Sequence, residues 1–300
     1  MRLYTDANER FRALAGRLER EGRPVVMSTD AEAPAGQTYK RCYVEVLGEV
    51  SGLRDARDCL PLGQRGVSWT WLGCEVAAYL DPRAPLPILA WKSRATVERF
   101  HRLRPDGRLR IPYGVPLEAI WRLAGELRRA PESRRVVVSF QRRGAYATAD
   151  ETPCALTSQF LLREGRLWSI NTYRSHDLFA GVRTDTARCS VVQQALAALL
   201  GVEPGPLVFE EGSLHYYPGR RHAPLYTFRR RPAGRVVAPA PPLLWRRALP
   251  RTEASMLMTE LERFCRYVGP LHFCAPADLA DFRSPFLRLL LSRMLSEHPA

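Results

Sequence analysis

The sequence contains no apolar run long enough to cross a membrane. Its longest apolar stretches, such as residues 191–200, are far shorter than the ~20 residues that a transmembrane helix needs. The opening residues, 1–6, also lack the apolar core of a signal peptide. We therefore expect a cytoplasmic, globular protein without a membrane partner.

Paired cysteines are missing as well. The seven cysteines form no CxxC motif, and no cysteine and histidine residues stand together at metal-binding spacing. An odd number of cysteines without such spacing argues against a disulfide framework and against a zinc site. We expect most of the cysteines to be packing residues, and no metal to be bound.

Lysine and acidic residues are scarce beside arginine. The formal net charge is +14, and only Lys40 and Lys92 among the 45 basic residues are lysines. The arginines are scattered along the chain, with one clear run at 229–231. Scattered charge forms no stripe for a nucleic acid to follow, so attraction for small anions is the favoured interpretation and nucleic-acid binding is the less favoured one.

The apolar pattern predicts a mixed arrangement of helices and strands. With 300 residues and 46% hydrophobic content, the chain can bury a full core. Helices are predicted from the 3.6-residue period within residues 9–21, 67–80, 117–127, 183–201, 252–268 and 285–294. Strands are predicted within residues 39–50, 136–140, 159–162, 167–172 and 207–210. Their uneven alternation predicts an α+β fold with one bent sheet covered by helices.

Local signals place several element ends. Gly22 and Gly201 are expected to end the first and fourth helices, and Thr252 and Ser284-Pro285 to cap the last two. The arginine-rich segment 91–110 is expected to be a surface loop. We interpret the proline-rich stretch 231–242 as an extended linker.

Groups typical of an enzyme site gather between residues 152 and 217. Cys154 follows a proline, and the polar stretch 173–181 contains an arginine, a histidine and an aspartate. His215 and Tyr217 close the segment. A possible nucleophile, an anion-binding group and general acid–base groups therefore stand between apolar runs, which predicts an enzyme site.

These residues resemble the thymidylate synthase superfamily. The matching motifs are Pro153-Cys154 followed by Gln159-Phe160, Tyr-Arg-Ser-x-Asp-x-x-x-Gly at 173–181, Gly-x-x-His-x-Tyr at 212–217, and the Ser-Arg-Arg of 133–135. The resemblance is strong from 132 to 217, thin from 61 to 114 and absent at both ends. It implies a single thymidylate synthase-like domain over 1–300, with one bent mixed sheet whose free face forms a dimer interface. Residues 61–230 would be the catalytic core, 1–60 a divergent N-terminal part and 231–300 a divergent C-terminal helical part.

The resemblance makes Cys154 the candidate nucleophile. In the family, a cysteine thiolate adds to C6 of a pyrimidine nucleotide, and C5 then attacks the one-carbon unit of 5,10-methylenetetrahydrofolate. A nearby cation such as the Arg174 guanidinium would favour the thiolate. The alternative from the residue alone is that Cys154 is one buried cysteine among several.

Phosphate binding is implied for four residues. Arginine offers the forked donors that a phosphate needs, and Arg174 with Ser175 would supply them within one chain. By resemblance, Arg134 and Arg135 would reach the site of a partner subunit. A homodimer that binds a nucleoside monophosphate and a reduced folate is thereby implied.

Further roles follow from the same resemblance. Glu75 falls where the family has a catalytic glutamate that organises water and protons; an edge position in water is the alternative. Tyr113 would be the proton-relay tyrosine, or ordinary packing. Asp177 would contact the pterin or the base, and His215 with Tyr217 would hold the sugar, although Tyr217 could also be plain core.

Asp185 departs from thymidylate synthases. It stands where the family has the asparagine that reads uracil, and a carboxylate can only accept hydrogen bonds. Facing cytosine, it could accept from the N4 amino group and from a protonated N3. The alternative is that Thr184-Asp185 caps an exposed helix start. Aspartate here resembles the cytidylate hydroxymethylases.

Two other departures favour addition of water over methylation. Ala155 replaces the histidine that usually follows the nucleophile, and residues 296–300 do not resemble the family's closing C-terminal peptide. Poorer exclusion of water would let water add to the intermediate and leave a hydroxymethyl group. Arg183-Thr184 replaces the usual Pro-Phe immediately before Asp185.

The sequence therefore predicts folate-dependent hydroxymethylation at C5 of CMP or dCMP. Methylation of dUMP is the alternative within enzymes. A member that has lost catalysis and binds RNA or another acidic partner is the alternative outside them. Ribose and deoxyribose are not distinguished by these residues.

Overall fold

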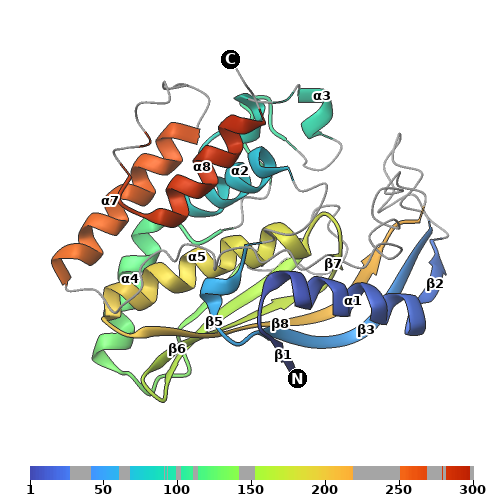
Figure 1. Cartoon of the computed structure of the whole chain (residues 1–300), viewed down its shortest axis with the longest axis horizontal. Coiled ribbons are helices and arrows are strands. Elements are labelled where there is room, and N and C mark those ends of the chain that lie inside the picture. The colour runs from blue at the N-terminus through green and yellow to red at the C-terminus, as the bar shows by residue number, and fades with distance from the viewer. Residues whose placement is uncertain are drawn as a thin grey trace.

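A computed structural model describes residues 1–27, 42–60, 68–90, 92, 94–98, 103–110, 114–141, 153–218, 251–268, 279 and 282–297. Within these residues, an eight-stranded sheet lies along one side of the molecule, and helices cover one of its faces (Figure 1). No helix in the described part of the chain has both the length and the apolar character that crossing a membrane requires.

The sheet mixes parallel and antiparallel pairs. Its strands are β1 (Arg2–Tyr4), β2 (Arg23–Val26), β3 (Cys42–Leu53), β4 (Val137–Ser139), β5 (Ala155–Arg163), β6 (Arg166–Tyr173), β7 (His176–Asp177) and β8 (Glu203–Tyr216). The order is β1-β3-β8-β6-β5-β4, with β2 on β3 and β7 on β8. β6 and β8 are parallel, whereas β3–β8 and β5–β6 are antiparallel. The mixed sheet expected from the sequence is therefore present.

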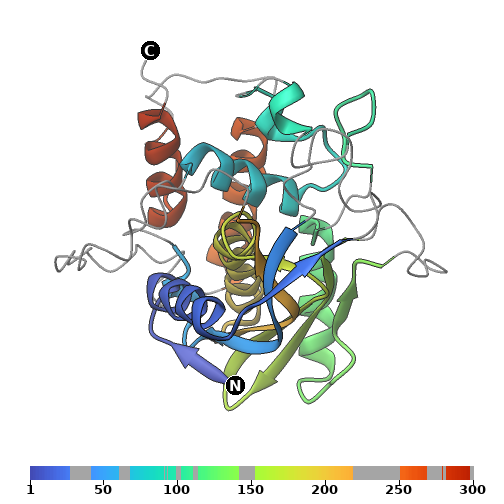
Figure 2. The same ribbon diagram turned by 90° about the vertical axis from the view of Figure 1, so that its right-hand side faces the viewer.

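The helices form two layers above the sheet. They are α1 (Ala7–Glu21), α2 (Trp69–Leu80), α3 (Arg94–Val97), α4 (Leu117–Arg129), α5 (Val182–Leu200), α7 (Arg251–Val268) and α8 (Pro285–Ser296), with short 3-10 turns η2 (Ala56–Asp58) and η3 (Pro87–Ala90). α5 lies on the sheet between α1 and α4, and α2, α7 and α8 lie beyond it (Figure 2). Nearly every residue of α5 is buried, as expected of the central helix.

Local chemistry explains the element ends. Glu164 and Gly165 join β5 to β6 with φ of 52° and 70°, the left-handed pair that a two-residue hairpin turn needs. Gly201 ends α5 with a left-handed φ of 72°, and the Ser284 side chain caps α8 through the Leu287 N–H, as the sequence predicts. Thr252 is not a cap, because α7 already begins at Arg251.

Other sequence expectations are corrected. Segment 91–110 is not simply a loop, because it contains α3 and a bridge between Leu103 and Leu109. The strand predicted at 207–210 extends over the whole of β8. The proline-rich stretch 231–242 lies outside the described part.

The sheet has a second face that no described helix covers (Figures 1 and 2). β6 alternates strictly, with Leu167, Ser169, Asn171 and Tyr173 buried. Trp168 and Ile170 alternate with them and are half-buried. Because successive side chains of a strand point to opposite faces, Trp168 and Ile170 lie on the uncovered face.

Candidate functional site

Three neighbouring strands bring the sequence motifs together. Cys154 precedes β5, and its carbonyl accepts a hydrogen bond of 2.9 Å from the Arg174 N–H at the end of β6. The Arg174 carbonyl accepts one of 3.2 Å from the Ser213 N–H on β8. The candidate nucleophile, the arginine and the segment that leads to His215 therefore lie side by side.

Cys154 differs from the buried cysteines. It is exposed, whereas Cys59, Cys74 and Cys189 are buried. Burial raises the pKa of the Cys59 thiol to about 12 and that of Cys189 to about 11, so both stay protonated at neutral pH. The packing alternative for Cys154 is wrong, because its side chain is accessible.

The Arg174 side chain is fixed next to the segment that carries Cys154. Its Nε donates a hydrogen bond of 3.1 Å to the carbonyl of Pro153, the residue before Cys154. Its side chain is half-buried, as is that of Ser175, the next residue. A guanidinium held at this turn has the forked donors that suit an anion.

Asp177 and His215 face one another across β7 and β8. They are register partners in the parallel pair, and the His215 carbonyl accepts from the Leu178 N–H at 2.8 Å. Asp177 Oδ1 accepts from the N–H groups of Phe179 and Ala180 at 2.8 and 3.1 Å. The backbone therefore fixes the orientation of this half-buried carboxylate.

His215 is a neutral, buried imidazole. Burial lowers its pKa, and Nδ1 lies 3.2 Å from the Ser213 carbonyl, to which it donates. Nε2 is then left as the acceptor. The ring lies 5.1 Å from Tyr217 and 5.6 Å from Tyr43, centroid to centroid. Tyr217 is half-buried beside His215, an arrangement that core packing alone does not require.

Asp185 is buried in the first turn of α5. Its Oδ1 lies 2.8 Å from Arg188 Nη2, and its Oδ2 lies 3.1 Å from His176 Nε2. Burial alone would raise the pKa of the carboxyl, but Arg188 and His176 outweigh burial and lower it. The exposed-cap alternative is wrong, because Asp185 is only 5% exposed and Gly181 is the cap residue, without a side-chain cap.

Glu75 is also buried and paired. It lies in α2, where Gly73 and Val76 are buried as well, and its Oε2 lies 3.2 Å from Arg188 Nη1. The alternative of an edge position in water is wrong. Arg188 thus joins the candidate catalytic glutamate to the candidate base-reading aspartate.

A carboxylate near the other end of the chain holds the start of α2. Glu297, after α8, accepts hydrogen bonds from the N–H groups of Trp69 and Thr70 at 2.7 and 3.0 Å. It also accepts from the hydroxyls of Ser68 and Thr70 at 3.1 and 2.8 Å. An anion at a helix N-terminus is stabilised by the unpaired N–H groups there. The helix that carries Glu75 is thereby tied to α8.

The remaining predicted residues are more separate. Arg134 and Arg135 are exposed before β4, and the Arg134 carbonyl accepts from Gln159 Nε2 at 2.8 Å on β5. Nothing in the described part joins these two arginines to Arg174 within one chain. Tyr113 lies outside the described residues.

Several residues around Asp185 were not predicted from the sequence: His176, Glu211, Arg10 and Arg188. Tyr43, which lies against the His215 ring, was not predicted either. His176 stands inside the polar motif, and Arg10 stands four residues before Leu14 on the apolar stripe of its helix. A charged residue on such a stripe is a signal of a buried ion pair.

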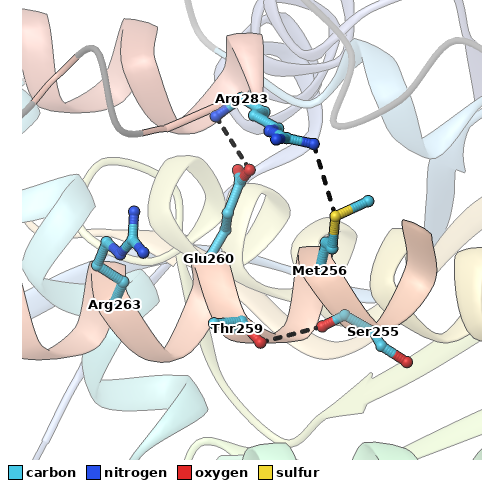
Figure 3. Close-up of a pocket in the computed structure, with 6 residues that line it drawn as sticks. All are labelled: Ser255, Met256, Thr259, Glu260, Arg263 and Arg283. Carbon is cyan, nitrogen blue, oxygen red and sulfur yellow. Dashed lines mark hydrogen bonds between the residues drawn. The ribbon is translucent and has the colours of Figure 1, made fainter. Parts of the chain in front are cut away.

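A separate hollow of about 380 Å³ lies over α7 (Figure 3). It is lined by Ser255, Met256, Thr259, Glu260, Arg263 and Arg283. Glu260 accepts from the Arg283 N–H at 3.0 Å. None of the residues predicted for catalysis lines this hollow. Among the described residues, no three His, Cys, Asp or Glu side chains are grouped to hold a metal.

The family model described as thymidylate synthase matches residues 99–264, more than half of the chain. The chain belongs to the thymidylate synthase family. The match includes the three neighbouring strands and α5, with Cys154, Arg174, Asp185 and His215, whereas Glu75 lies before it.

Similar curated proteins match over a shorter range. A putative thymidylate synthase of Methanothermobacter marburgensis is 30% identical over 110 residues, 37% of this chain and 48% of that protein. A thymidylate synthase of Coxiella burnetii (strain Dugway 5J108-111) is 31% identical over 110 residues, 37% of this chain and 42% of that protein. The chain thus matches less than half the length of each relative.

Proposed function

We propose that this chain hydroxymethylates C5 of CMP or dCMP, using 5,10-methylenetetrahydrofolate as the one-carbon donor. Membership of the thymidylate synthase family supports one-carbon transfer to a pyrimidine nucleotide. The choice of cytosine rests on one observation, the carboxylate of Asp185 that Arg188 and His176 keep ionised.

An ionised Asp185 suits cytosine and not uracil. Each carboxylate oxygen has more than one acceptor site, so Asp185 can accept from a base while Arg188 and His176 remain in place. Cytosine offers its N4 amino group and, when protonated, N3–H. Uracil would present O4, a second acceptor, to a buried anion. Such a mismatch costs about 1–3 kcal/mol or more.

Cys154 begins the proposed reaction. Its thiolate forms a bond to C6, and electron density moves to C5, which takes up the carbon that the reduced folate supplies. C5 then loses its proton while the bond from the transferred carbon to the folate nitrogen breaks, which would release tetrahydrofolate and leave an exocyclic methylene group. Water adds to this carbon, and the C6–S bond breaks. The product is the 5-hydroxymethyl nucleotide, and the folate is not oxidised.

The other side chains would bind and orient the substrates. Arg174 and Ser175 would hold the phosphate next to the nucleophile, and His215 with Tyr217 would hold the sugar. The buried Glu75, fixed by Arg188, would order water and protons. Asp177, oriented by two backbone N–H groups, fits a contact to an N–H of a pterin or base. Tyr113 is proposed as the proton-relay residue from the sequence resemblance alone.

A homodimer would complete the phosphate site. The face of the sheet without described helices presents the half-buried Trp168 and Ile170, a composition typical of the centre of an interface. Arg134 and Arg135 are exposed before β4, at the edge of the same sheet. We propose that this face pairs with a second copy, to whose site Arg134 and Arg135 contribute.

Three parallel reactions test the function. The protein is incubated with methylenetetrahydrofolate and either CMP, dCMP or dUMP, and products are identified by mass spectrometry while dihydrofolate is followed by absorbance. We expect a 5-hydroxymethyl product from a cytidine nucleotide without dihydrofolate, and none from Cys154→Ser. Conversion of dUMP with formation of dihydrofolate would replace the proposal with thymidylate synthesis. Should no nucleotide lose tritium from C5, the non-catalytic alternative is favoured.

A further inference from the structure

A continuous chain of buried charges runs through the molecule beneath the proposed site. Its members, in order of contact, are Arg10, Glu211, His176, Asp185, Arg188 and Glu75. They come from α1, β8, β7, α5 and α2. Each is less than a tenth exposed. Burial of six ionisable groups is costly unless their charges balance.

The middle of the chain is a histidine between two carboxylates. His176 Nδ1 lies 2.6 Å from Glu211 Oε1, and His176 Nε2 lies 3.1 Å from Asp185 Oδ2. Nδ1 is hydrogen-bonded to Glu211, whereas Nε2 makes a close charge contact with Asp185 without hydrogen-bond geometry. A ring between two carboxylates is favoured in its charged form, because the imidazolium balances their negative charge. With His176 charged, three cations balance three anions along the chain.

Arg10 holds the far end in place. Its Nη2 lies 2.7 Å from Glu211 Oε1, and its Nε and Nη1 donate to the hydroxyls of Ser51 and Thr186 at 3.0 and 3.2 Å. Every nitrogen of this guanidinium therefore has a partner. Glu211 cannot turn away from His176 without breaking the contact with Arg10.

The surroundings of His176 agree with a positive ring. Burial disfavours its charge, but Asp185 and Glu211 outweigh burial and raise its pKa. The ring stacks on Tyr173 with centroids 4.3 Å apart. On β8, the neutral His215 is the other titratable group nearby. Arg10 contacts Glu211 and Arg188 contacts Asp185, so each arginine is separated from His176 by a carboxylate.

We propose that His176 is a positioning residue for base choice. Held by Glu211 and Arg10, it fixes the side chain of Asp185 and keeps that carboxylate negative, so that only a cytosine can be accepted. A protonated Asp185 could donate to O4 of uracil, so loss of the His176 charge would relax selectivity. This inference rests on the proposed function of Asp185.

The test compares His176→Gln with wild type. Glutamine keeps an N–H donor but not the charge. We expect the ratio of kcat/KM for cytidine over uridine nucleotides to fall about tenfold or more, since an opposite charge at 3–4 Å shifts a carboxyl pKa by 1–3 units. The acid limb of the pH profile with the cytidine nucleotide should move to higher pH. The control is Cys189→Ala, which alters a buried, uncharged side chain nearby on α5. It should leave both the kcat/KM ratio and the acid limb unchanged.

An unchanged ratio and an unchanged acid limb in His176→Gln would overturn the inference. If wild type acts on dUMP, the proposed function fails. His176 is then judged by a second measurement, which also serves if the variant does not fold. In long-range ¹H–¹⁵N spectra of histidine-labelled wild type, one of the six imidazoles should stay protonated on both nitrogens well above its ordinary pKa of 6.5. If all six histidines titrate at or below that ordinary pKa, the inference about His176 is overturned.

Discussion

At the scale of single residues, the proposed function makes base choice depend on the charge of Asp185. Asparagine and aspartate have nearly the same shape, so the two differ mainly in what they donate. In this chain Arg188 and His176 lie 2.8 and 3.1 Å from the carboxylate oxygens, and both lower the pKa of Asp185. The proposed selectivity is therefore a property of three residues and not of one.

Asp185→Asn should reverse the preference. The amide can donate to O4 of uracil, and its pairing with cytosine is worse by about 1–3 kcal/mol, which corresponds to about 5- to 150-fold in kcat/KM. We expect loss on the cytidine nucleotide together with a gain on the uridine nucleotide. Steady-state kinetics measure both, and Cys189→Ala, one turn later on α5 and without a contact to the carboxylate, is the matched control. A variant that loses both activities at an unchanged melting temperature would argue against base reading.

The residues found from the sequence were those with a motif. Cys154, Arg174, Asp177 and His215 stand in short patterns, and the structure brings their backbones together on β5, β6, β7 and β8. Arg10 and Glu211 have no such pattern. The two residues are 201 positions apart in the chain, and only the packing of α1 on the sheet brings them together.

At the scale of elements, α2 depends on the C-terminal helix. Glu297 accepts four hydrogen bonds at the first turn of α2, and Gly73 of α2 packs closely on Met294 of α8. The position of Glu75 is thus set by a contact between segments that are more than 200 residues apart.

Glu297→Gln should loosen this contact and remove part of the acid sensitivity. Because the carboxylate is exposed, solvent screens part of its interaction with the helix. We therefore expect the variant to have a free energy of unfolding lower by about 0.5–1 kcal/mol, as when a helix cap is lost. Burial raises the pKa of Glu297, but the N–H groups of Thr70 and Trp69 outweigh burial and lower it. Its contribution is therefore present above pH 4.5 and lost as pH falls through the folded pKa. Urea unfolding from pH 3 to 7 measures this change in the free energy of unfolding. Equal stability of variant and wild type at pH 7 would refute a stabilising contact between Glu297 and the start of α2.

Helices and strands with clear periods were predictable from the sequence, and their ends less so. α5 has an apolar stripe and a terminal glycine, so both its existence and its end were predicted. β8 was predicted too short, because its outer part contains Glu210, Glu211 and Gly212, which break the apolar pattern. The buried ion pair explains why a glutamate stands inside that strand.

At the scale of the whole molecule, the buried chain of charges links α1 and α2 to the core. Arg10 and Glu75 lie outside the residues that match the family model, and His176, Asp185, Arg188 and Glu211 lie inside them. Residues that precede the matched range therefore balance charges within it.

Stability should be greatest in mildly acidic solution. His176 has a raised pKa in the folded protein. Its contribution to the free energy of unfolding is therefore complete below pH 6.5 and is lost as pH rises through the folded pKa. Asp185 and Glu211 have lowered pKa values, so their contributions are complete above 3.8 and 4.5 and are lost as pH falls. Denaturant unfolding across pH should give a maximum between 4.5 and 6.5, and His176→Gln should flatten the decline above 6.5. A wild-type decline that the variant retains in full would show that His176 is not its source.

Mixing two inactive variants tests the shared site. Cys154→Ser lacks the nucleophile, and the double variant Arg134→Ala, Arg135→Ala lacks the donors proposed to act in the partner's site. After exchange of subunits, half of the dimers are mixed and each has one intact site, so about a quarter of the sites should be active. Recovery of activity on mixing supports the dimer across the uncovered sheet face. Its absence, with mixed dimers demonstrated by mass, would contradict it.

The most direct measurement is the trapping of the nucleophile with a fluorinated base. Fluorine at C5 cannot leave as the proton does, so the adduct between cysteine and C6 should accumulate in the presence of methylenetetrahydrofolate. Intact-protein mass spectrometry with peptide mapping should find 5-fluoro-dCMP or 5-fluoro-CMP attached to Cys154, and 5-fluoro-dUMP not attached. Attachment of 5-fluoro-dUMP alone, or of any of the three to a cysteine other than Cys154, would contradict the account.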